Sequence, residues 1–308
     1  MRYIISSVLS MLPLSALAEV PRVITDIPPV YGLVAQVMGD LGAPVLLLEK
    51  GADEHDFQLR PSQMTDIASA DVAVWIGPDL TPWLERALEG AKGDMASLPL
   101  LAVAGTNLLE FGAVDDQSDD HAGEQADDQG HGHGHSGTEP HAWLNPENAA
   151  PWLDAIAAAL SAKDSGNAAT YAENAATAKA EIAMLDAEIS AALAPIKDKG
   201  FVAYHDAYQY FSTHYGLNYQ GAVAMGDASA AGAAHLHKVQ STIADGVVCV
   251  FPEAQHDADL LLQLTDGTAA KAGAALDPAG VMLDPSLTSY TDVLRNLTAA
   301  LAGCLSGA

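Results

Sequence analysis

The sequence has few basic side chains and few cysteines for a chain of 308 residues. Its 13 lysines and arginines stand against 40 aspartates and glutamates, which gives a formal net charge of −27 at pH 7. This sign excludes nucleic acid as a partner, because phosphate backbones are bound by clustered positive charge. An acidic field attracts cations, but it also keeps a protein soluble. Charge alone therefore does not distinguish a cation-binding role from simple solubility.

Long hydrophobic runs are also missing after the N-terminus. Met1 and Arg2 form a short basic start, Tyr3–Leu14 is mostly apolar, and Ala16–Ala18 reads Ala-Leu-Ala. This order predicts a secretory signal peptide over residues 1–18. The apolar stretch is shorter than the ~20 residues of a membrane-spanning helix, and no cysteine follows the cleavage site to accept a lipid anchor. We therefore expect a soluble, exported mature chain that begins at Glu19.

The two cysteines, Cys249 and Cys304, fit an exported protein. In an oxidising compartment an isolated pair most simply forms a disulfide, which here would join the apolar run Val247–Phe251 to the C-terminal segment. The alternative is a pair of metal-binding thiolates, for which no CxxC spacing is present.

Short apolar runs alternate with helix-like segments through both halves of the chain. Such alternation predicts parallel sheets with right-handed crossovers, and the length allows two domains. We expect strands at Val23–Ile27, Pro44–Leu48, Val72–Ile76, Leu98–Val103, Phe201–Tyr204, Tyr219–Ala224, Val247–Phe251 and Ala272–Leu276. In the first half, helices are expected near Val30–Gly39, Pro61–Ala70 and Pro82–Leu88.

A long helix is expected between the two halves, over Asn167–Leu193. Its apolar residues recur at steps of three and four, which marks one helical face, and no glycine or proline interrupts it. A helix of this length is a stiff spacer that disfavours large hinge closure. The predicted organisation is an N-terminal lobe at 19–164, a linking helix at 165–196 and a C-terminal lobe at 197–308.

An acidic, glycine-rich tract with several histidines lies near the middle of the chain, at Asp115–His135. It has too little apolar surface to offset the entropy of ordering it, so we expect a mobile loop over residues 115–138. One interpretation makes its histidines a weak auxiliary metal site, and the other makes it a solvated insertion with incidental metal affinity. The histidines in question are His121, His131, His133 and His135.

Three other histidines lie where predicted strands pass into loops. His55 follows Pro44–Leu48, His205 follows Phe201–Tyr204, and His141 precedes an Asn-Pro helix start. Ligands of open α/β sheets bind at the carboxyl ends of strands, so these side chains should meet at one edge. Glu253 and Asp277 are expected at the same edge, with Glu253 interpreted as a rim residue.

These segments resemble the periplasmic metal-binding proteins of ABC importers, and more narrowly their zinc-uptake, ZnuA-like branch. The resemblance covers nearly the whole mature chain in order, through the segments GADEHDFQLRPSQ, ADVAVWIGPDL, EPHAWLNPENA, AYHDAYQYF and LDPAG. It implies two lobes, each with a four-stranded parallel sheet flanked by helices, joined by one long rigid helix. Metal is implied in the cleft between the lobes.

Residue by residue, the resemblance implies that His55, His141 and His205 are the metal ligands. In manganese-binding relatives a glutamate usually occupies the position of His205, so histidine there favours Zn²⁺. The histidine-rich insertion and the Cys249–Cys304 disulfide are likewise typical of the zinc branch. The fourth ligand is left open between Asp277, which is slightly favoured as a ligand or as a partner of one, Glu54 and water.

The predicted function is therefore capture of Zn²⁺ and its delivery to a membrane permease with its own ATPase. The protein is expected to act as a monomer, and a periplasmic zinc chaperone is a further candidate partner. The first alternative is a manganese-binding or other divalent-metal-binding protein of the same fold. The second is a zinc hydrolase, but the sequence contains no H-E-x-x-H motif and no evident general base, so we expect no enzyme activity.

Overall fold

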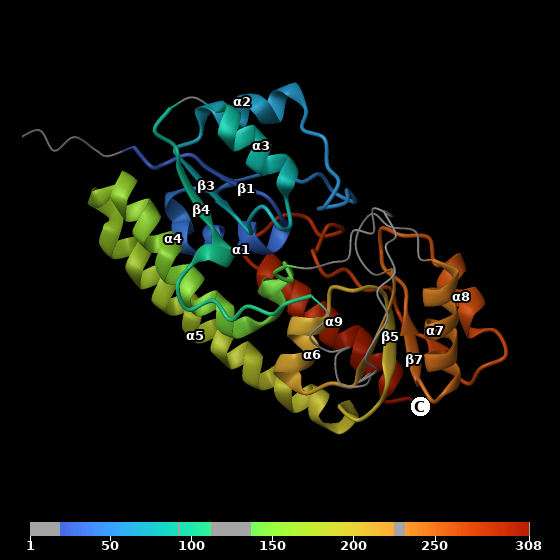
Figure 1. The fold of residues 1–308 in the computed structure, drawn as a ribbon. Helices are drawn as coiled ribbons and strands as arrows, with labels where there is room; N and C mark the ends of the chain where they lie inside the picture. Colours follow the sequence, from blue (N-terminus) through green and yellow to red (C-terminus); the bar gives the residue numbers. More distant parts are fainter. Residues whose placement is uncertain (1–18, 92, 112–136, 225–231, 308) are drawn as a thin grey trace, which may run out of the picture.

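Two α/β lobes lie side by side along one long helix (Figure 1). The structure is a computed structural model that describes residues 19–91, 93–111, 137–224 and 232–307. Each lobe is built on a four-stranded sheet in which all neighbouring strands are parallel. The predicted fold class is confirmed. No helix in the described ranges is long and apolar enough to cross a membrane.

The N-terminal lobe has the strand order β2-β1-β3-β4. Its strands are β1 (Val23–Thr25), β2 (Val45–Leu46), β3 (Val72–Trp75) and β4 (Ala96–Pro99). The helices are α1 (Pro28–Met38), α2 (Pro61–Ser69), α3 (Pro82–Gly90) and α4 (Ala149–Lys163). The first three of these helices begin at a proline, whose fixed φ suits the first helical turn.

The C-terminal lobe has the strand order β6-β5-β7-β8. Its strands are β5 (Phe201–His205), β6 (Tyr219–Ala224), β7 (Cys249–Phe251) and β8 (Lys271–Ala272). The helices are α6 (Gln209–Tyr215), α7 (Ala233–Ala244), α8 (Asp259–Thr265) and α9 (Ser289–Leu305). Helix α9 crosses toward the N-terminal lobe and packs on α1.

Two expected strands end in irregular backbone. The run Leu98–Val103 leaves the sheet at Pro99 and turns into a 3₁₀ helix, Leu100–Ala102, whose first two leucines are buried. The run Ala272–Leu276 contributes only Ala272 to β8 and a single bridge from Leu276 to Glu253. Apolar residues that follow a strand can be buried from a turn as well as from a hydrogen-bonded strand. Apolar periodicity alone therefore predicts these strands to be longer than they are.

The long helix α5 spans Ala168–Leu193, between two 3₁₀ turns at Ser165–Asn167 and Ala194–Ile196. Its 26 residues give a length of ~39 Å at about 1.5 Å per residue. The apolar face predicted from spacing is the buried face: Tyr171, Ala175, Ala178, Ile182, Leu185, Ile189 and Leu193. Because α5 packs on α1 and α4 of one lobe and on α9 of the other, it holds the lobes together.

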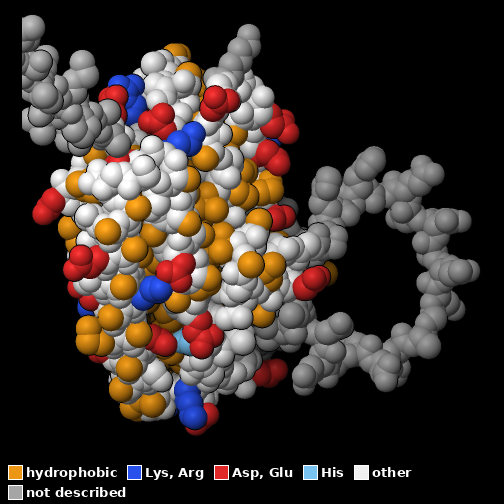
Figure 2. All heavy atoms as spheres, turned by 90° about the vertical axis from the view of Figure 1, so that its left-hand side faces the viewer, with side chains coloured by type: hydrophobic (Ala, Val, Ile, Leu, Met, Phe, Trp, Pro, Cys, Tyr) orange, Lys and Arg blue, Asp and Glu red, His pale blue; other side chains and the backbone are white. Residues whose placement is uncertain are grey.

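The outer side of the molecule is the left-hand side of Figure 1, where α4 and α5 lie. Figure 2 shows this face, with acidic side chains spread between apolar ones. The largest exposed apolar side chain on α5 is Met184, at 66% exposure. The apolar groups visible here are interspersed with polar ones, as is usual at a protein surface.

A disulfide joins Cys249 of β7 to Cys304 of α9, with the two Cα atoms 6.3 Å apart. The predicted pairing is confirmed, and it excludes the two cysteines as thiolate ligands. The bond ties the C-terminal sheet to the helix that reaches into the other lobe. It closes a loop over a sequence separation of 55 residues, which in the chain-entropy model corresponds to roughly 4 kcal/mol of stabilisation.

Asp26 is a buried carboxyl group at the carboxyl end of β1. Its side chain is fully buried and accepts backbone N–H bonds from Ile27 (2.9 Å) and Ile76 (2.8 Å). Thr81 Oγ1 lies 3.4 Å from the same carboxylate. Asp26 thus joins the ends of β1 and β3. Burial raises its pKa to about 7, and the hydrogen bonds from Ile76 and Ile27 oppose that rise.

We predict that Asp26 makes the protein less stable as the pH rises through about 7. The pKa of this group is 3.8 without the fold and about 7 in it, so the unfolded chain loses the proton first. Its contribution is therefore fully present below pH 3.8 and is lost as pH rises through the folded value. Each pH unit between the two values is worth up to about 1.4 kcal/mol.

The measurement compares urea unfolding of the unaltered protein with that of Asp26→Asn between pH 5 and 8.5. The variant cannot titrate, so its stability relative to the unaltered protein should increase with pH. A difference that stays constant over this range would contradict the assigned titration.

Candidate metal centre

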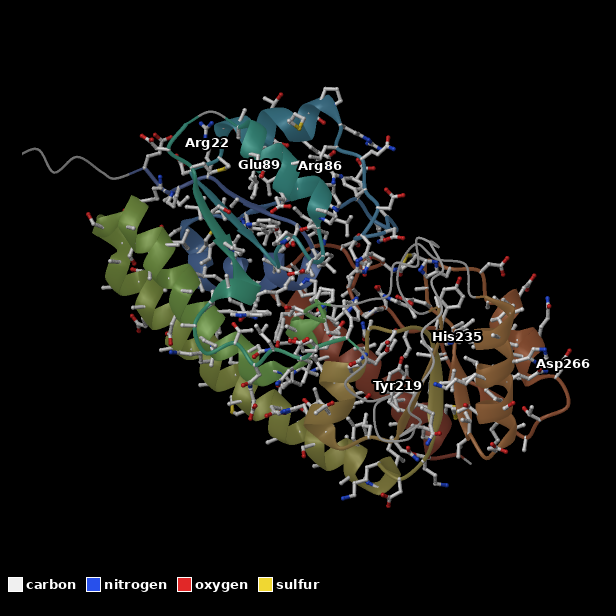
Figure 3. The ribbon with its side chains drawn as sticks, viewed as in Figure 1. Arg22, Arg86, Glu89, Tyr219, His235 and Asp266 are labelled. Atoms are coloured by element: carbon white, nitrogen blue, oxygen red, sulfur yellow. A yellow bond between two sulfur atoms is a disulfide. The ribbon has the colours of Figure 1, made fainter. Side chains whose placement is uncertain are left out.

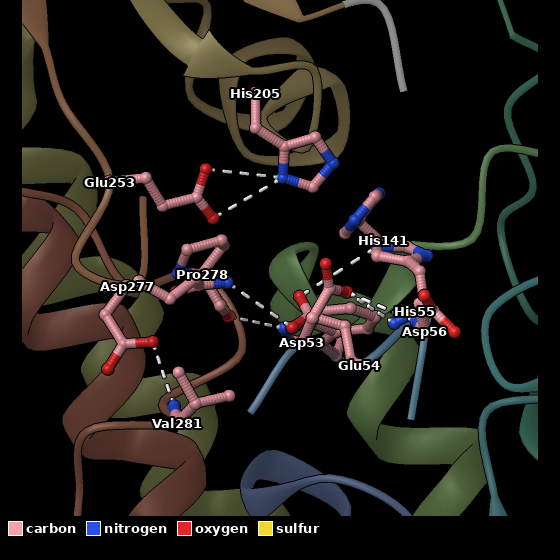
Figure 4. Close-up of polar contacts among 12 residues, drawn as sticks. Asp53, Glu54, His55, Asp56, His141, His205, Glu253, Asp277, Pro278 and Val281 are labelled. Atoms are coloured by element: carbon pink, nitrogen blue, oxygen red, sulfur yellow. Dashed lines mark hydrogen bonds and ion pairs between the residues drawn. The ribbon is translucent and has the colours of Figure 1, made fainter. Parts of the chain in front are cut away.

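Three histidines from separate segments converge between the lobes (Figure 4). One potential ligand atom of each of His55, His141 and His205 lies within 4.8 Å of the others. The ring centroids are 5.0 Å apart for His141 and His205, 5.4 Å for His55 and His141, and 5.6 Å for His55 and His205. His141 and His205 are buried and His55 is partly exposed. The positions of these residues at strand ends predict this convergence.

The loop after β2 places His55. Leu47 and Leu48 continue the pairing with β1 through N–H bonds to the carbonyls of Thr25 and Asp26. The Asp53 carboxylate then accepts the His55 N–H at 2.8 Å, which closes a tight turn. Trp83 donates its indole N–H to the Glu54 carbonyl at 2.8 Å and anchors the turn to α3.

The segment Glu139–His141 is positioned by contacts with both lobes. The Glu139 N–H donates to the Leu109 carbonyl at 2.9 Å, and Tyr210 of α6 donates its hydroxyl to the Glu139 carbonyl at 3.1 Å. After His141 the chain enters the 3₁₀ turn Ala142–Leu144, whose first carbonyl accepts the Asn148 side-chain N–H. Asn145 caps the next 3₁₀ turn, Pro146–Asn148, which leads into α4, as the Asn-Pro pair predicts.

His205 is the last residue of β5 and pairs with Ala224 of β6. Its Nδ1 lies 3.4 Å from both carboxylate oxygens of Glu253, which follows the adjacent strand β7. Glu253 was expected at the rim of the cleft, but it is only 2% exposed. Parallel strands that end at one edge bring this acid beside the histidine.

Each histidine of the cluster has a buried glutamate beside it. Glu139 contacts His141 Nδ1, and Glu253 lies against His205 Nδ1. Glu54 Oε1 is 3.9 Å from Nε2 of His55. A carboxylate at Nδ1 selects the tautomer whose Nε2 carries the lone pair for a metal. The arrangement of His141 and His205 is therefore suited to ligation through Nε2.

Sequence reasoning did not identify Glu139 as a site residue. The residue stands two positions before His141 in EPHAW, so the signal was present as an acid separated from the histidine by one proline. The missing information was the direction of the side chain. Only the fold shows the carboxylate turned back onto the imidazole.

Burial controls the charge of the acids around the cluster. It raises the pKa of Glu139 well above its ordinary value. It also raises the pKa of Glu54, and the nearby charge of Glu253 adds to that rise. A cation bound among the imidazoles would favour the ionised carboxylates, since opposite charges stabilise one another strongly in a buried site.

Asp277 lies near this cluster, but its carboxylate is turned aside (Figure 4). The two oxygens accept backbone N–H bonds from Val281 and Met282, each at 2.9 Å. The group of mutually close ligand atoms found among the described residues contains the three histidines and not Asp277. Glu54 is linked to the other lobe by Gln255, whose amide nitrogen lies 3.4 Å from its Oε2.

Three of the other described histidines have contacts of their own. His214 Nε2 lies 2.8 Å from the Asp186 carboxylate, and His256 stacks on the ring of Tyr204. His235 is on α7, where Nε2 lies 2.9 Å from the Ala222 carbonyl (Figure 3). The candidate auxiliary ligands of the insertion lie outside the described residues: His121, His131, His133 and His135.

The fold and the histidine cluster define a two-lobed binding protein with a candidate metal centre between its lobes. A profile of the family described as zinc-uptake complex component A, periplasmic, matches residues 23–304. The chain belongs to this family.

Curated relatives match over almost their whole length. The high-affinity zinc uptake system protein ZnuA of Paracoccus denitrificans is 46% identical, over 98% of this chain and 97% of that protein. The ZnuA protein of Brucella suis is 34% identical, over 95% of this chain and 94% of its own.

Solved structures with the same fold are more distant in sequence. The laminin-binding protein Lmb of Streptococcus agalactiae superposes with a TM-score of 0.75 at 21% identity, over 92% of this chain and 99% of that one. The AdcAII protein of Streptococcus pneumoniae gives 0.74 at 23% identity, over 92% and 98%. At these identities the likeness shows the fold alone.

We predict that zinc binding weakens as the pH falls from 7.5 to 5. A metal-bound imidazole must be neutral, and an ordinary imidazole takes up a proton near pH ~6.5. Protons therefore compete with the metal at His55, His141 and His205. The affinity is measured by competition with a chelator whose own proton affinity is known. A flat affinity over this range would contradict a site made of three histidines.

Proposed function

We propose that this protein captures Zn²⁺ in the cleft between its lobes and delivers it to the membrane permease of an ATP-driven zinc importer. The observation that carries the proposal is the convergence of three imidazoles from three segments, with ligand atoms within 4.8 Å. Family membership supports transport as the purpose of the site. The high-affinity zinc uptake named for the Paracoccus denitrificans relative supports zinc as the cargo.

In this proposal His55, His141 and His205 are the protein ligands of the metal. Three neutral imidazoles suit Zn²⁺, whereas Mn²⁺ prefers carboxylate and other oxygen ligands. The sequence leaves Asp277, Glu54 and water as donors for the fourth position, and the direction of the Asp277 carboxylate supports Glu54 or water. Manganese as cargo is the second candidate, since buried carboxylates surround the histidines.

The proposed role is binding without catalysis. A catalytic zinc site needs an open position and a nearby general base. Here Glu139 and Glu253 lie against imidazole nitrogens, which suits them to orient ligands. Turnover of an ester or peptide by the zinc-loaded protein would refute this part of the proposal.

The proposal also covers the location of the protein and the role of the histidine-rich insertion. Residues 1–18 act as a cleaved signal peptide, and the mature protein acts in the periplasm as a monomer. It receives zinc directly or from a periplasmic chaperone. The histidines of residues 115–138 form a weaker auxiliary site that gathers zinc near the cleft.

We predict that His205→Ala loses the tight zinc site. The loss should exceed the about 10- to 100-fold that follows removal of a partner behind a ligand, because a ligand itself is removed. Chelator competition and calorimetric titration give the affinity. His214→Ala is the matched control, since His214 contacts Asp186 away from the cluster.

An affinity unchanged by His205→Ala would refute the ligand set. Displacement of zinc from the unaltered protein by manganese at comparable concentration would refute the choice of metal.

We predict that replacing residues 115–135 by a short Gly-Ser linker keeps the tight site and removes only weak metal binding. The ends of the insertion are held together by a bridge between Glu110 and Thr138, so a short linker can close the gap. Calorimetric titration should show the same high affinity with fewer weakly bound ions. Loss of high-affinity binding would contradict the proposed division between the cleft and the insertion.

A further inference from the structure

The segment Leu276–Asp284 of the C-terminal lobe contacts the supports of all three histidines, and we name it the interlobe strap. It begins at the single bridge that pairs Leu276 with Glu253. It then passes between the lobes and ends at Asp284, on the surface. Its contacts with the three supports come from different residues.

The first contact positions Glu253, the carboxylate partner of His205. The Leu276 N–H donates to the Pro252 carbonyl at 2.8 Å, and the Ala254 N–H donates to the Leu276 carbonyl at 2.8 Å. These two bonds enclose Glu253, whose carboxylate lies against His205 Nδ1. The start of the strap therefore determines where that carboxylate stands.

The second contact crosses to the segment of His141. Trp143 donates its indole N–H to the carbonyl of Pro278 at 2.8 Å. The ring of Trp143 also packs against the imidazole of His141, with centroids 5.1 Å apart. Because Trp143 is fully buried, this bond is shielded from water.

The third contact reaches the loop of His55. The Gly51 N–H donates to the Val281 carbonyl at 2.9 Å, and Lys50 forms an ion pair with Asp284 at 2.8 Å. Gly51 has φ +76°, a conformation that other residues rarely adopt. The loop that carries His55 is thus hydrogen-bonded to the strap at Gly51, four residues before the histidine.

Asp277 braces the strap internally. Its carboxylate accepts the N–H groups of both Val281 and Met282, and thereby holds the turn in which Val281 meets Gly51. The turn has little room to change: Gly280 has φ +68°, and a Cβ there would lie 2.6 Å from Val293 Cγ2. Figure 4 shows the Asp277 carboxylate directed toward Val281 rather than toward His205.

We propose that Asp277 is a positioning residue of the zinc site and not one of its ligands. By bracing the strap it sets the relative positions of His55, His141 and His205. The inference rests on the proposed function, because the positions matter only if the three imidazoles hold one metal.

The test compares the unaltered protein with Asp277→Asn. The amide has a single acceptor oxygen and presents an NH₂ group to the second backbone N–H, so the brace is weakened at nearly constant volume. Zinc affinity should fall about 10- to 100-fold, as it does when a partner behind a ligand is removed. The visible spectrum of the Co²⁺-loaded protein should keep its band positions, which follow the donor atoms, whereas its intensities, which follow the angles between the ligands, should change.

Trp143→Phe provides an independent variant, since it removes the indole bond to Pro278 and leaves Asp277 intact. It should also weaken zinc binding, and the double variant should lose less affinity than the sum of the two single losses. Asp266→Asn is the matched control, because Asp266 lies on an exposed turn far from the cleft (Figure 3). It should bind zinc as the unaltered protein does.

Three results would overturn the proposal. A shift of the Co²⁺ band positions in Asp277→Asn would make Asp277 a ligand. An unchanged zinc affinity, even with a lower unfolding temperature, would make it a residue of the fold only. If the affinity losses of Asp277→Asn and Trp143→Phe were strictly additive, the two residues would act independently, and Asp277 would not position His141 through the strap. Failure of the unaltered protein to bind zinc would instead refute the proposed function itself, and the strap's role with it.

Discussion

The structure depends on keeping imidazole and carboxylate groups together in a space from which water is largely excluded. A divalent cation held by three neutral imidazoles alone would leave two buried positive charges without compensation, which is costly in a low dielectric. Glu139 and Glu253 supply negative charge at Nδ1 of His141 and His205, and Glu54 lies near Nε2 of His55. Burial makes Glu54 and Glu139 hard to ionise on their own. The cation and the carboxylates therefore stabilise one another, which couples binding to the charge state of the cleft.

The two lobes are held in a fixed relation by elements that cross between them. Helix α5 packs on α1 and α4 of the first lobe and on α9 of the second. Helix α9 returns to pack on α1 and is tied to its own sheet by the disulfide. The strap adds polar contacts close to the metal centre. Motion during metal exchange is therefore expected in the short loops that carry the ligands rather than in a wide hinge.

Much of the site could be predicted from the sequence, because strand ends are where a parallel sheet presents its ligands. His205 ends a predicted strand and His55 follows one, so both were placed at the cleft without any contact being known. Glu253 was placed at the right edge but expected at the rim, since burial depends on what packs over it. Glu139 was not identified, because a side chain separated from its histidine by one proline can point either way.

The sequence by itself determined the two parallel sheets, the buried face of α5, the three candidate histidines and the pairing of the cysteines. These follow from local periodicity, from residue chemistry and from the small number of possible partners. The tertiary structure alone decided which oxygen and nitrogen atoms meet. It turned Glu139 and Glu253 onto imidazole nitrogens and directed Asp277 toward the backbone N–H groups of Val281 and Met282. Such choices depend on side-chain direction and on contacts between residues far apart in the chain, and no short stretch of sequence encodes them.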